Sequence, residues 1–266
     1  MNSKEDYFRA YKFFEEKYDK LGMNNFDYFY IYSDLRGFAF KLGKNLTKNE
    51  FCSAVIQPLL DKNKTAVIPT YTYTLDGIFN VTKTPTRLGA LNSWVLKQPN
   101  VCRSEHPLFS FGALGNDAGL VKNCGKSAFG ENSVFERLRG KKCCFLYIDK
   151  SLTLGNTLMQ NVEQACGATY RYNKSFKTKV FNNNDYIGTD YTAFLRRRDV
   201  DGNDFLPETK KGYSDPLYKA GIVKEVNDSE KLSNISLLDY DKVRETLVEL
   251  FYNNQSVFIT KDFVQY

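Results

Sequence analysis

The chain has 266 residues, of which 42% are hydrophobic and 26% are charged, so it is long and apolar enough to bury a sizeable core. Its apolar runs, such as Cys143 to Ile148, are far shorter than the roughly 20 residues that cross a membrane. Residues 1–6 do not resemble a signal peptide. We therefore expect a soluble, cytoplasmic globular protein without membrane insertion.

The net charge of +6 suits an anionic ligand, but the basic residues are spread along the chain instead of forming one stripe. Nucleic acid is therefore not an expected partner. The six cysteines show no C-x-x-C spacing and His106 is the only histidine, so no metal site is expected. Most of the 18 tyrosines and 21 phenylalanines fall in alternating or helical patterns and are assigned to the core.

Apolar spacing predicts four elements near the start of the chain: a helix over residues 3–21, a strand over 27–32, a helix from about 48 to 61 and a strand over 65–69. Ser3 is the candidate N-cap of the first helix and Gly22 ends it. Thr47 and Glu50 have the spacing of a capping box at the start of the second helix.

Further along, the pattern predicts a helix over 88–97, a strand over 142–148, a helix from about 156 or 157 to Gly167, hairpins within 171–205, and a last helix capped by Asp239. No Pro-rich or Gly/Ser linker interrupts this mixture. The sequence therefore predicts one α/β domain over residues 1–266, with a central mixed sheet flanked by helices and a β-rich insertion in the second half.

Two segments are dense in chemically active groups. Residues 103–115 hold a cation, hydroxyls, His106 and a turn closed by glycine, which indicates either a ligand-binding segment or a well-bonded loop around a buried histidine. In the helix near residue 157, Thr157, Gln160 and Glu163 follow i, i+3, i+6 spacing and share one polar face.

These segments resemble the aminoglycoside 3-N-acetyltransferase family, which moves an acetyl group from acetyl-CoA to an amine on a sugar. The order and spacing of several stretches carry the resemblance over nearly the whole chain: 29–35, 84–91, 103–115, 129–138, 155–163, 167–174, 199–205 and 220–223. The family pattern on the polar helix is Thr-x-x-His-x-x-Glu. In this chain, Gln160 stands where the family usually has its catalytic histidine.

The resemblance implies direct transfer in a ternary complex, with Thr157, Gln160 and Glu163 at the catalytic position. A glutamine side chain cannot take the proton of an ammonium group, although it can hydrogen bond. Three explanations stay open: an engineered substitution, a natural member with a changed mechanism, or a binding protein derived from an enzyme. Glu163 is either a substitute base or a helix carboxylate that is hydrogen-bonded to the strand beneath. An acyl-enzyme route through Cys102 and His106 has little support in the sequence.

The resemblance also implies where acetyl-CoA lies. Residues 29–35 resemble the family's Val-His-Ser-Ser-Leu segment, with Tyr32 in place of the histidine, and α/β proteins bind ligands at such strand ends. The residues expected to contact CoA are Ser33, Asp34, Leu35, Thr84, Ser104, His106, Ser110 and Phe111.

The residues expected to contact the acceptor are Tyr73, Tyr170, Arg171, Asp201 and Asp204. The two aspartates would attract an aminosugar cation, although an Asp-Gly-Asn turn also has backbone reasons to exist. We expect a nucleotide-linked or lipid-linked amino sugar of surface-polysaccharide biosynthesis in preference to an aminoglycoside, and a homo-oligomer is one of the states that the sequence allows. The alternative is a catalytically inactive CoA- or sugar-binding protein of the same fold.

Overall fold

The computed structural model describes residues 3–152, 157–197, 214–227, 234–255 and 258. Seven strands form one mixed sheet in the order β11-β12-β6-β1-β2-β5-β4. The strands are β1 (Tyr28–Ser33), β2 (Thr65–Pro69), β4 (Cys102–Arg103), β5 (Phe111–Gly115), β6 (Cys143–Ile148), β11 (Val223–Asn227) and β12 (Asn234–Asp239). The central strands β6, β1 and β2 are parallel, and an antiparallel pair adjoins them on each side. The predicted central mixed sheet is confirmed.

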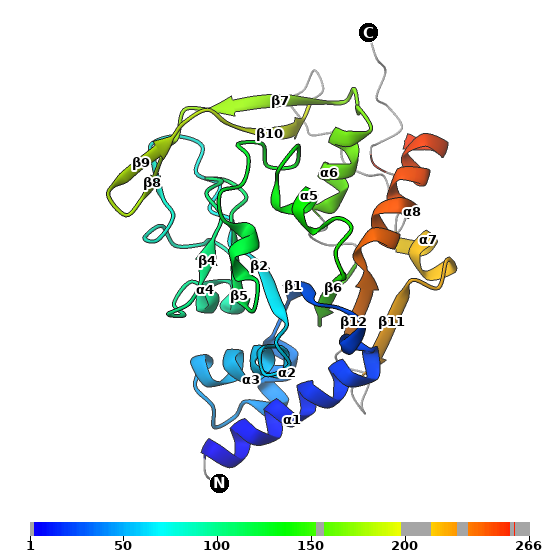
Figure 1. The fold of residues 1–266 in the computed structure, drawn as a ribbon. Helices are drawn as coiled ribbons and strands as arrows, with labels where there is room; N and C mark the ends of the chain where they lie inside the picture. The colour runs from blue at the N-terminus through cyan, green and yellow to red at the C-terminus, as the bar shows by residue number, and fades with distance from the viewer. Residues whose placement is uncertain (1–2, 153–156, 198–213, 228–233, 256–257, 259–266) are drawn as a thin grey trace.

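Helices cover both faces of this sheet (Figure 1). The helices are α1 (Ser3–Leu21), α2 (Arg36–Leu42), α3 (Lys48–Leu60), α4 (Ala90–Val95), α5 (Val134–Leu138), α6 (Leu158–Ala165), α7 (Ser214–Lys219) and α8 (Tyr240–Asn253), with short 3-10 turns at Met23–Asn25 and Ala118–Val121. One buried cluster joins α1, α3 and α4 to the sheet, and a second joins α5, α6 and α8 to its other face. Within the described ranges, no helix is both long and apolar enough to span a membrane.

Strand β1 shows how the sequence divides between the two faces. Phe29 and Ile31 belong to the cluster under α1 and α3, whereas Tyr30 and Tyr32 belong to the cluster under α5 and α6. Successive side chains of a strand point to opposite faces, so the alternation Phe-Tyr-Ile-Tyr is sufficient to produce this division. It places two phenol rings beneath α6.

The β-rich insertion lies outside the central sheet (Figure 1). Strand β7 (Arg171–Phe176) pairs antiparallel with β10 (Tyr191–Arg196), and β8 (Lys179–Asn182) pairs with β9 (Asp185–Gly188) and with β3 (Ile78–Asn80). The turn between β8 and β9 contains Asn183 at φ 54°. The predicted hairpins are therefore present in the described part of 171–205.

Several predicted boundaries agree closely with the structure. Helix α1 ends before Gly22, whose φ is 81°, and the Thr47–Glu50 capping box has both of its reciprocal hydrogen bonds. Asp239 accepts a hydrogen bond from the amide of Lys242 and caps α8. In contrast, the helix predicted over 88–97 is shorter in the structure, where α4 covers only Ala90–Val95.

The segment 103–115, considered as a ligand-binding stretch, contains the hairpin of β4 and β5 at one edge of the sheet. The Ser104 amide donates to the Phe111 carbonyl at 2.9 Å, and the Phe111 amide donates to Ser104 Oγ at 2.8 Å. These two bonds continue the hairpin pairing past β4, so much of this segment is a paired and buried part of the sheet.

Gly115 ends β5 at a position where only glycine fits. Its φ is 110°, and a Cβ atom there would lie 2.0 Å from the Lys64 carbonyl oxygen. We expect Gly115→Ala to lower the free energy of unfolding by at least about 2 kcal/mol, because both the backbone conformation and the contact are unfavourable. Urea unfolding measures this change.

Gly119→Ala is the matched control, since nothing lies within 4 Å of its added Cβ atom and its φ is not positive. It should change the free energy of unfolding by less than about 0.5 kcal/mol. Equal effects of the two substitutions would contradict this interpretation of Gly115.

Candidate active site

A cluster of four hydroxyl groups lies between the sheet and the start of α6. Thr157 Oγ1 lies 2.9 Å from Tyr30 OH, 3.0 Å from Tyr32 OH and 2.9 Å from Tyr71 OH. The Thr157 amide also donates to Tyr32 OH at 3.2 Å. Burial raises the pKa of Tyr30, Tyr32 and Tyr71, so all three stay neutral phenols at physiological pH. The cluster fixes the start of α6 and supplies no base.

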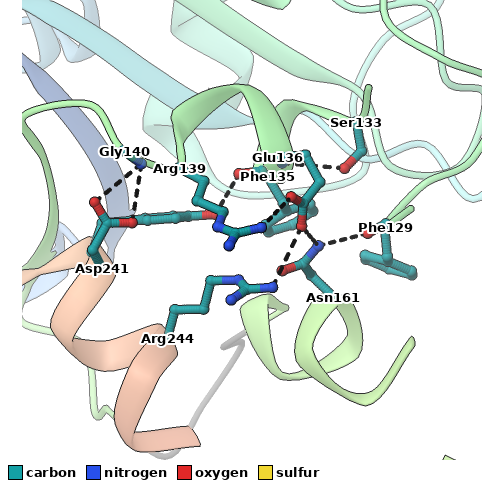
Figure 2. Close-up of polar contacts among 10 residues, drawn as sticks. Phe129, Ser133, Phe135, Glu136, Arg139, Gly140, Asn161, Asp241 and Arg244 are labelled. Carbon is teal, nitrogen blue, oxygen red and sulfur yellow. Dashed lines mark hydrogen bonds and ion pairs between the residues drawn. The ribbon is translucent and has the colours of Figure 1, made fainter. Parts of the chain in front are cut away.

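A second set of contacts holds the middle of α6 from the side of α5 and α8 (Figure 2). Asn161 is buried, and its Nδ2 donates to the Phe129 carbonyl at 2.6 Å and to Glu136 Oε1 at 2.8 Å. Arg244 of α8 approaches the same Glu136 oxygen at 3.8 Å. Since Asn161 faces α5, its neighbour Gln160 is directed elsewhere.

The third contact is a buried ion pair between α6 and the insertion. Glu163 Oε2 lies 2.6 Å from Arg171 Nε, and the two side chains are 0% and 3% exposed. Burial raises the pKa of Glu163, while the Arg171 guanidinium opposes this shift by favouring the carboxylate. Tyr170 is also buried and hydrogen bonds to Glu163. Glu163 is thus held by a structural contact, but its partner belongs to β7 of the insertion and not to the strand beneath the helix, as the sequence analysis had considered.

Gln160 lines a pocket of about 630 Å³ between α6 and the insertion. The lining residues are Leu75, Gln160, Arg171, Tyr172, Lys174, Phe176, Leu195 and Arg196. The Gln160 Oε1 atom is buried and has no hydrogen-bond partner among the described residues. The structure thus brings together Gln160 and Arg171 of the predicted residues, with Thr157 one turn away on α6.

A second pocket, of about 440 Å³, lies at the carboxyl end of β1. It is lined by Ser33, Asp34, Leu35, Arg36, Ala39, Gly43, Leu46, Lys48, Phe51, Cys52, Gly89, Ala90, Leu91 and Lys150. The predicted strand-end residues Ser33, Asp34 and Leu35 therefore share one cavity. Asp34 pairs with Arg36 at 2.5 Å, and this contact lowers the pKa of the Asp34 carboxyl. Much of the pocket lining is apolar, and Arg36, Lys48 and Lys150 are the three cationic residues in it.

The other predicted CoA contacts line neither of these pockets. Ser104, Ser110 and Phe111 are at most 1% exposed. Ser110 Oγ donates to the Thr70 carbonyl at 2.8 Å, and Phe111 packs against aromatic rings. In this conformation these side chains face the interior, because they hold the β4–β5 hairpin together.

Arg103 explains the position of the Thr84 segment. Its buried guanidinium donates to the carbonyls of Thr84 at 2.5 Å, Val81 at 3.1 Å and Thr70 at 3.0 Å, and to Ser110 Oγ at 3.2 Å. Burial lowers the pKa of Arg103 to about 10. The cation is retained in the interior because carbonyl oxygens surround it. Thr84 thus belongs to a structural junction and lines neither pocket described above.

His106 uses both ring nitrogens within the protein. Nε2 lies 3.0 Å from the Thr192 carbonyl, and Nδ1 accepts from the amides of Leu108 and Phe109, each at 3.2 Å. The carbonyl requires a proton on Nε2, and the two amides require a lone pair on Nδ1, so the ring is neutral. Burial lowers the pKa of His106 to about 4. This is the buried, well-bonded histidine that the sequence left as one alternative.

The remaining predicted acceptor contacts are dispersed. Tyr73 is 43% exposed, has a φ of 52°, and packs its ring against Tyr71 and Phe109. Asp201 and Asp204 lie outside the described residues. The residues that the sequence analysis did not select are Tyr30, Tyr71, Lys48, Lys150, Lys174 and Arg196. Of these, Tyr30 and Lys174 had a local signal, since they lie in the stretches 29–35 and 167–174 that were compared with the family.

The geometry offers no cysteine nucleophile beside the histidine. Burial raises the pKa of Cys52 to about 11 and of Cys124 to about 12, and the bonds of His106 are made to backbone groups. All six cysteines are free thiols. Over the described ranges, no three His, Cys, Asp or Glu side chains gather as ligands of a metal ion would.

Solved structures share this fold. Aminoglycoside acetyltransferase AAC(3)-IIb has a TM-score of 0.74 at 16% identity, over 94% of this chain and 98% of its own. AAC-IIIb in a binary complex with CoASH has a TM-score of 0.73 at 14% identity, over 95% of this chain and 98% of its own. AAC-VIa bound to sisomicin has a TM-score of 0.71 at 15% identity, over 91% of this chain and 97% of its own. No match is found among curated proteins. This chain therefore has the same fold as these three structures.

The sequence itself makes the assignment more specific. The family described as aminoglycoside 3-N-acetyltransferase matches residues 55–215, which is more than half of the chain. The chain belongs to this family of acyltransferases. The family that the motifs predicted is therefore confirmed.

The neutral state of His106 has a consequence for stability. The unfolded chain takes up a proton at this ring below pH ~6.5, whereas the folded protein does so only near pH 4. Unfolding free energy should therefore be lost as the pH falls from 6.5 to 4, by about 3 kcal/mol in total from this group. Urea unfolding at pH 7 and pH 4.5 should show a smaller loss for His106→Gln.

Because the chain has one histidine, the two carbon-bound ring protons of His106 give NMR signals that report its pKa directly. A titration midpoint near pH 6.5 in the folded protein would contradict the buried, neutral ring.

The hydroxyl cluster can be tested with Tyr32→Phe. This change leaves the Thr157 amide without its acceptor and should lower the free energy of unfolding by about 1–3 kcal/mol. Hydrogen exchange should become faster at the first turn of α6. Tyr18→Phe is the control, since it also removes one buried hydrogen bond but lies on the other face of the sheet. Faster exchange in α6 of both variants would exclude a specific role for Tyr32.

Proposed function

We propose that this chain is an acetyl-CoA-dependent N-acetyltransferase that acts on an amino sugar by direct transfer in a ternary complex. The neutral amine attacks the thioester carbonyl, a C–N bond forms and the C–S bond breaks. One amine proton is released as the amide forms, and the CoA thiolate takes up a proton. The acceptor ammonium must first lose a proton, since the protonated amine has no lone pair.

The pocket at the end of β1 is the proposed donor site. Its apolar wall, which includes Leu46, Phe51 and Leu91, suits the pantetheine arm. Lys48 and Lys150 at the same pocket suit the phosphate groups of CoA, because ammonium groups pair well with phosphate. Carboxyl ends of parallel strands are a common place for ligands in α/β proteins. The binding of CoASH by AAC-IIIb, which has the same fold, agrees with this proposal.

The observation that carries the proposal is the connection between the two pockets. Ser33 lines the first pocket, and its neighbour Tyr32 bonds to Thr157, one turn before Gln160 in the second pocket. We propose that the acceptor amine lies over the α6 face at Gln160. The Gln160 Oε1 atom is buried without a partner in this conformation, and we propose that the side chain turns toward the pocket, where Oε1 accepts from an amine N–H and orients the nucleophile.

One observation favours the inactive binding protein as a second candidate. Within the described residues, no candidate base near Gln160 is suited to proton abstraction, because Glu163 is held by Arg171 and the three phenols have raised pKa values. His106 is bonded to backbone groups. In this candidate, the chain keeps the donor and acceptor pockets and has lost turnover.

The two candidates are separated by Gln160→His. If position 160 is that of the general base, the substitution should raise the rate of CoA thiol release from acetyl-CoA by roughly 10² to 10⁴, the usual contribution of such a group. Thiol release is measured with nucleotide-linked amino sugars and aminoglycosides as acceptors.

Gln164→His is the matched control, because Gln164 lies one turn further along α6 and bonds to Ser127 and Asn173. It should leave the rate unchanged. If Gln160→His raised the rate of thiol release by less than about tenfold, position 160 would not be that of the general base. Tight acetyl-CoA binding without transfer in either protein would support the binding-protein candidate.

A further inference from the structure

An exposed aromatic ring lies at the rim of the pocket at the end of β1. Arg36 and Ala39 of α2 line this pocket together with Gly43, which ends the helix. Helical spacing places Phe40 one turn after Arg36 and on the same side of α2, whereas Phe38 points to the other side and is buried in the core. Phe40 is 76% exposed. Its ring can therefore contact a ligand that extends out of the pocket.

A lysine accompanies this ring. The ammonium group of Lys44 lies 5.9 Å from the centre of the Phe40 ring, a separation at which a cation and an aromatic face attract each other. Lys44 is exposed, as is Lys48 at the start of α3, which lines the pocket. An aromatic surface, an ammonium group beside it and a second ammonium group at the pocket thus lie within nine residues of the chain, 40–48.

The neighbouring charges are taken up by contacts within the protein. Asp34 forms an ion pair with Arg36 at 2.5 Å, so we do not count Arg36 as available for an anion. Glu50 is engaged in the capping box of α3. Among the residues that the structure describes, Lys44 and Lys48 have no ion-pair partner. These two ammonium groups are therefore the ones that a bound anion would meet at the rim.

The two ends of CoA have to lie on different sides of the sheet. Helix α2 packs on the face that it shares with α1 and α3, whereas α6 packs on the other face (Figure 1). The thioester has to reach the α6 face at Gln160, and Ser33 at the end of β1 lines the pocket between them. With the pantetheine arm in this pocket, the adenosine end extends along α2. Phe40 lies about 6 Å further along the α2 axis than Arg36.

We propose that Phe40 stacks on the adenine ring of CoA and that Lys44 binds its 3′-phosphate. This inference rests on the proposed function. Stacking on an aromatic side chain is a common way to hold a base, and ammonium groups form strong charge-assisted hydrogen bonds with phosphate oxygens. The 3′-phosphate is attached to the ribose that carries adenine. A ring with an ammonium group beside it therefore matches this end of the donor.

Titration calorimetry with the full chain tests the inference with three ligands. CoA carries every group, dephospho-CoA lacks the 3′-phosphate, and 4′-phosphopantetheine lacks the whole adenosine part. We expect affinity to fall in this order, by at least about fivefold at each step. Phe40→Ala should weaken the binding of CoA and of dephospho-CoA by about tenfold and leave that of 4′-phosphopantetheine unchanged, because only the first two ligands have a base to stack.

Lys44→Gln separates the phosphate from the base. It should weaken the binding of CoA and leave that of dephospho-CoA unchanged, so that the preference for CoA disappears. In the unchanged protein this preference should fall as salt is raised, since the contact is exposed. Circular dichroism checks that the variants are folded.

Phe8 and Lys12 of α1 provide matched controls. Phe8 is 60% exposed and the Lys12 ammonium lies 5.6 Å from its ring centre, but neither residue lines the pocket. Phe8→Ala and Lys12→Gln should leave the affinities for all three ligands unchanged. A loss of CoA affinity in these variants as large as in Phe40→Ala and Lys44→Gln would show an unspecific effect and overturn the inference.

The same measurements separate the inference from the proposed function. If CoA binds and Phe40→Ala does not weaken it, the donor site stands while the inference fails. Equal binding of CoA and 4′-phosphopantetheine would also overturn the inference, because the donor would then be recognised through its pantetheine arm alone. If none of the three ligands binds, the proposed function itself fails.

Discussion

The buried ion pair between Glu163 and Arg171 joins the insertion to the central domain. Both charges are removed from water, a situation that proteins tolerate when the charges are paired and hydrogen bonded. The pair fixes β7 against α6, and β7 in turn fixes β10 through its register. One wall of the Gln160 pocket therefore depends on a contact made by a neighbouring residue on the same helix. The pocket exists because the helix and the hairpin are held together at this point.

Helix α6 is short, and contacts in several directions determine where its side chains point. Thr157 bonds to phenols from β1 and from the segment after β2, Asn161 bonds to α5, and Glu163 bonds to β7. Eight residues would not keep a helical conformation alone in water, so packing and these polar contacts hold it. Gln160 lies on the side of α6 that these contacts do not use, and it lines the pocket between α6 and the insertion. Its position is thus a result of how its neighbours are bonded.

Much of the fold was predictable because its signals are local. The capping box at Thr47, the glycine after α1 and the apolar run of β2 each fall within a few residues of sequence. The hydroxyl cluster was not predictable, since Tyr30, Tyr71 and Thr157 are far apart in the chain and meet only after the parallel strands pair. The same holds for His106, whose partner Thr192 lies in the insertion. The many polar side chains in residues 103–115 are explained by the hydrogen bonds that they make within the β4–β5 hairpin at the edge of the sheet.

The two outer strands of the sheet limit how copies of this protein can associate. Strand β4 has two residues, and β11 carries the charged side chains Lys224 and Glu225. Short or charged edges resist the addition of a strand from another molecule, which is a common start of aggregation. A continuous intermolecular sheet is therefore disfavoured at both margins. Among the described residues, this leaves the helical surfaces and the insertion, rather than the edges of the central sheet, as the places where two copies could associate.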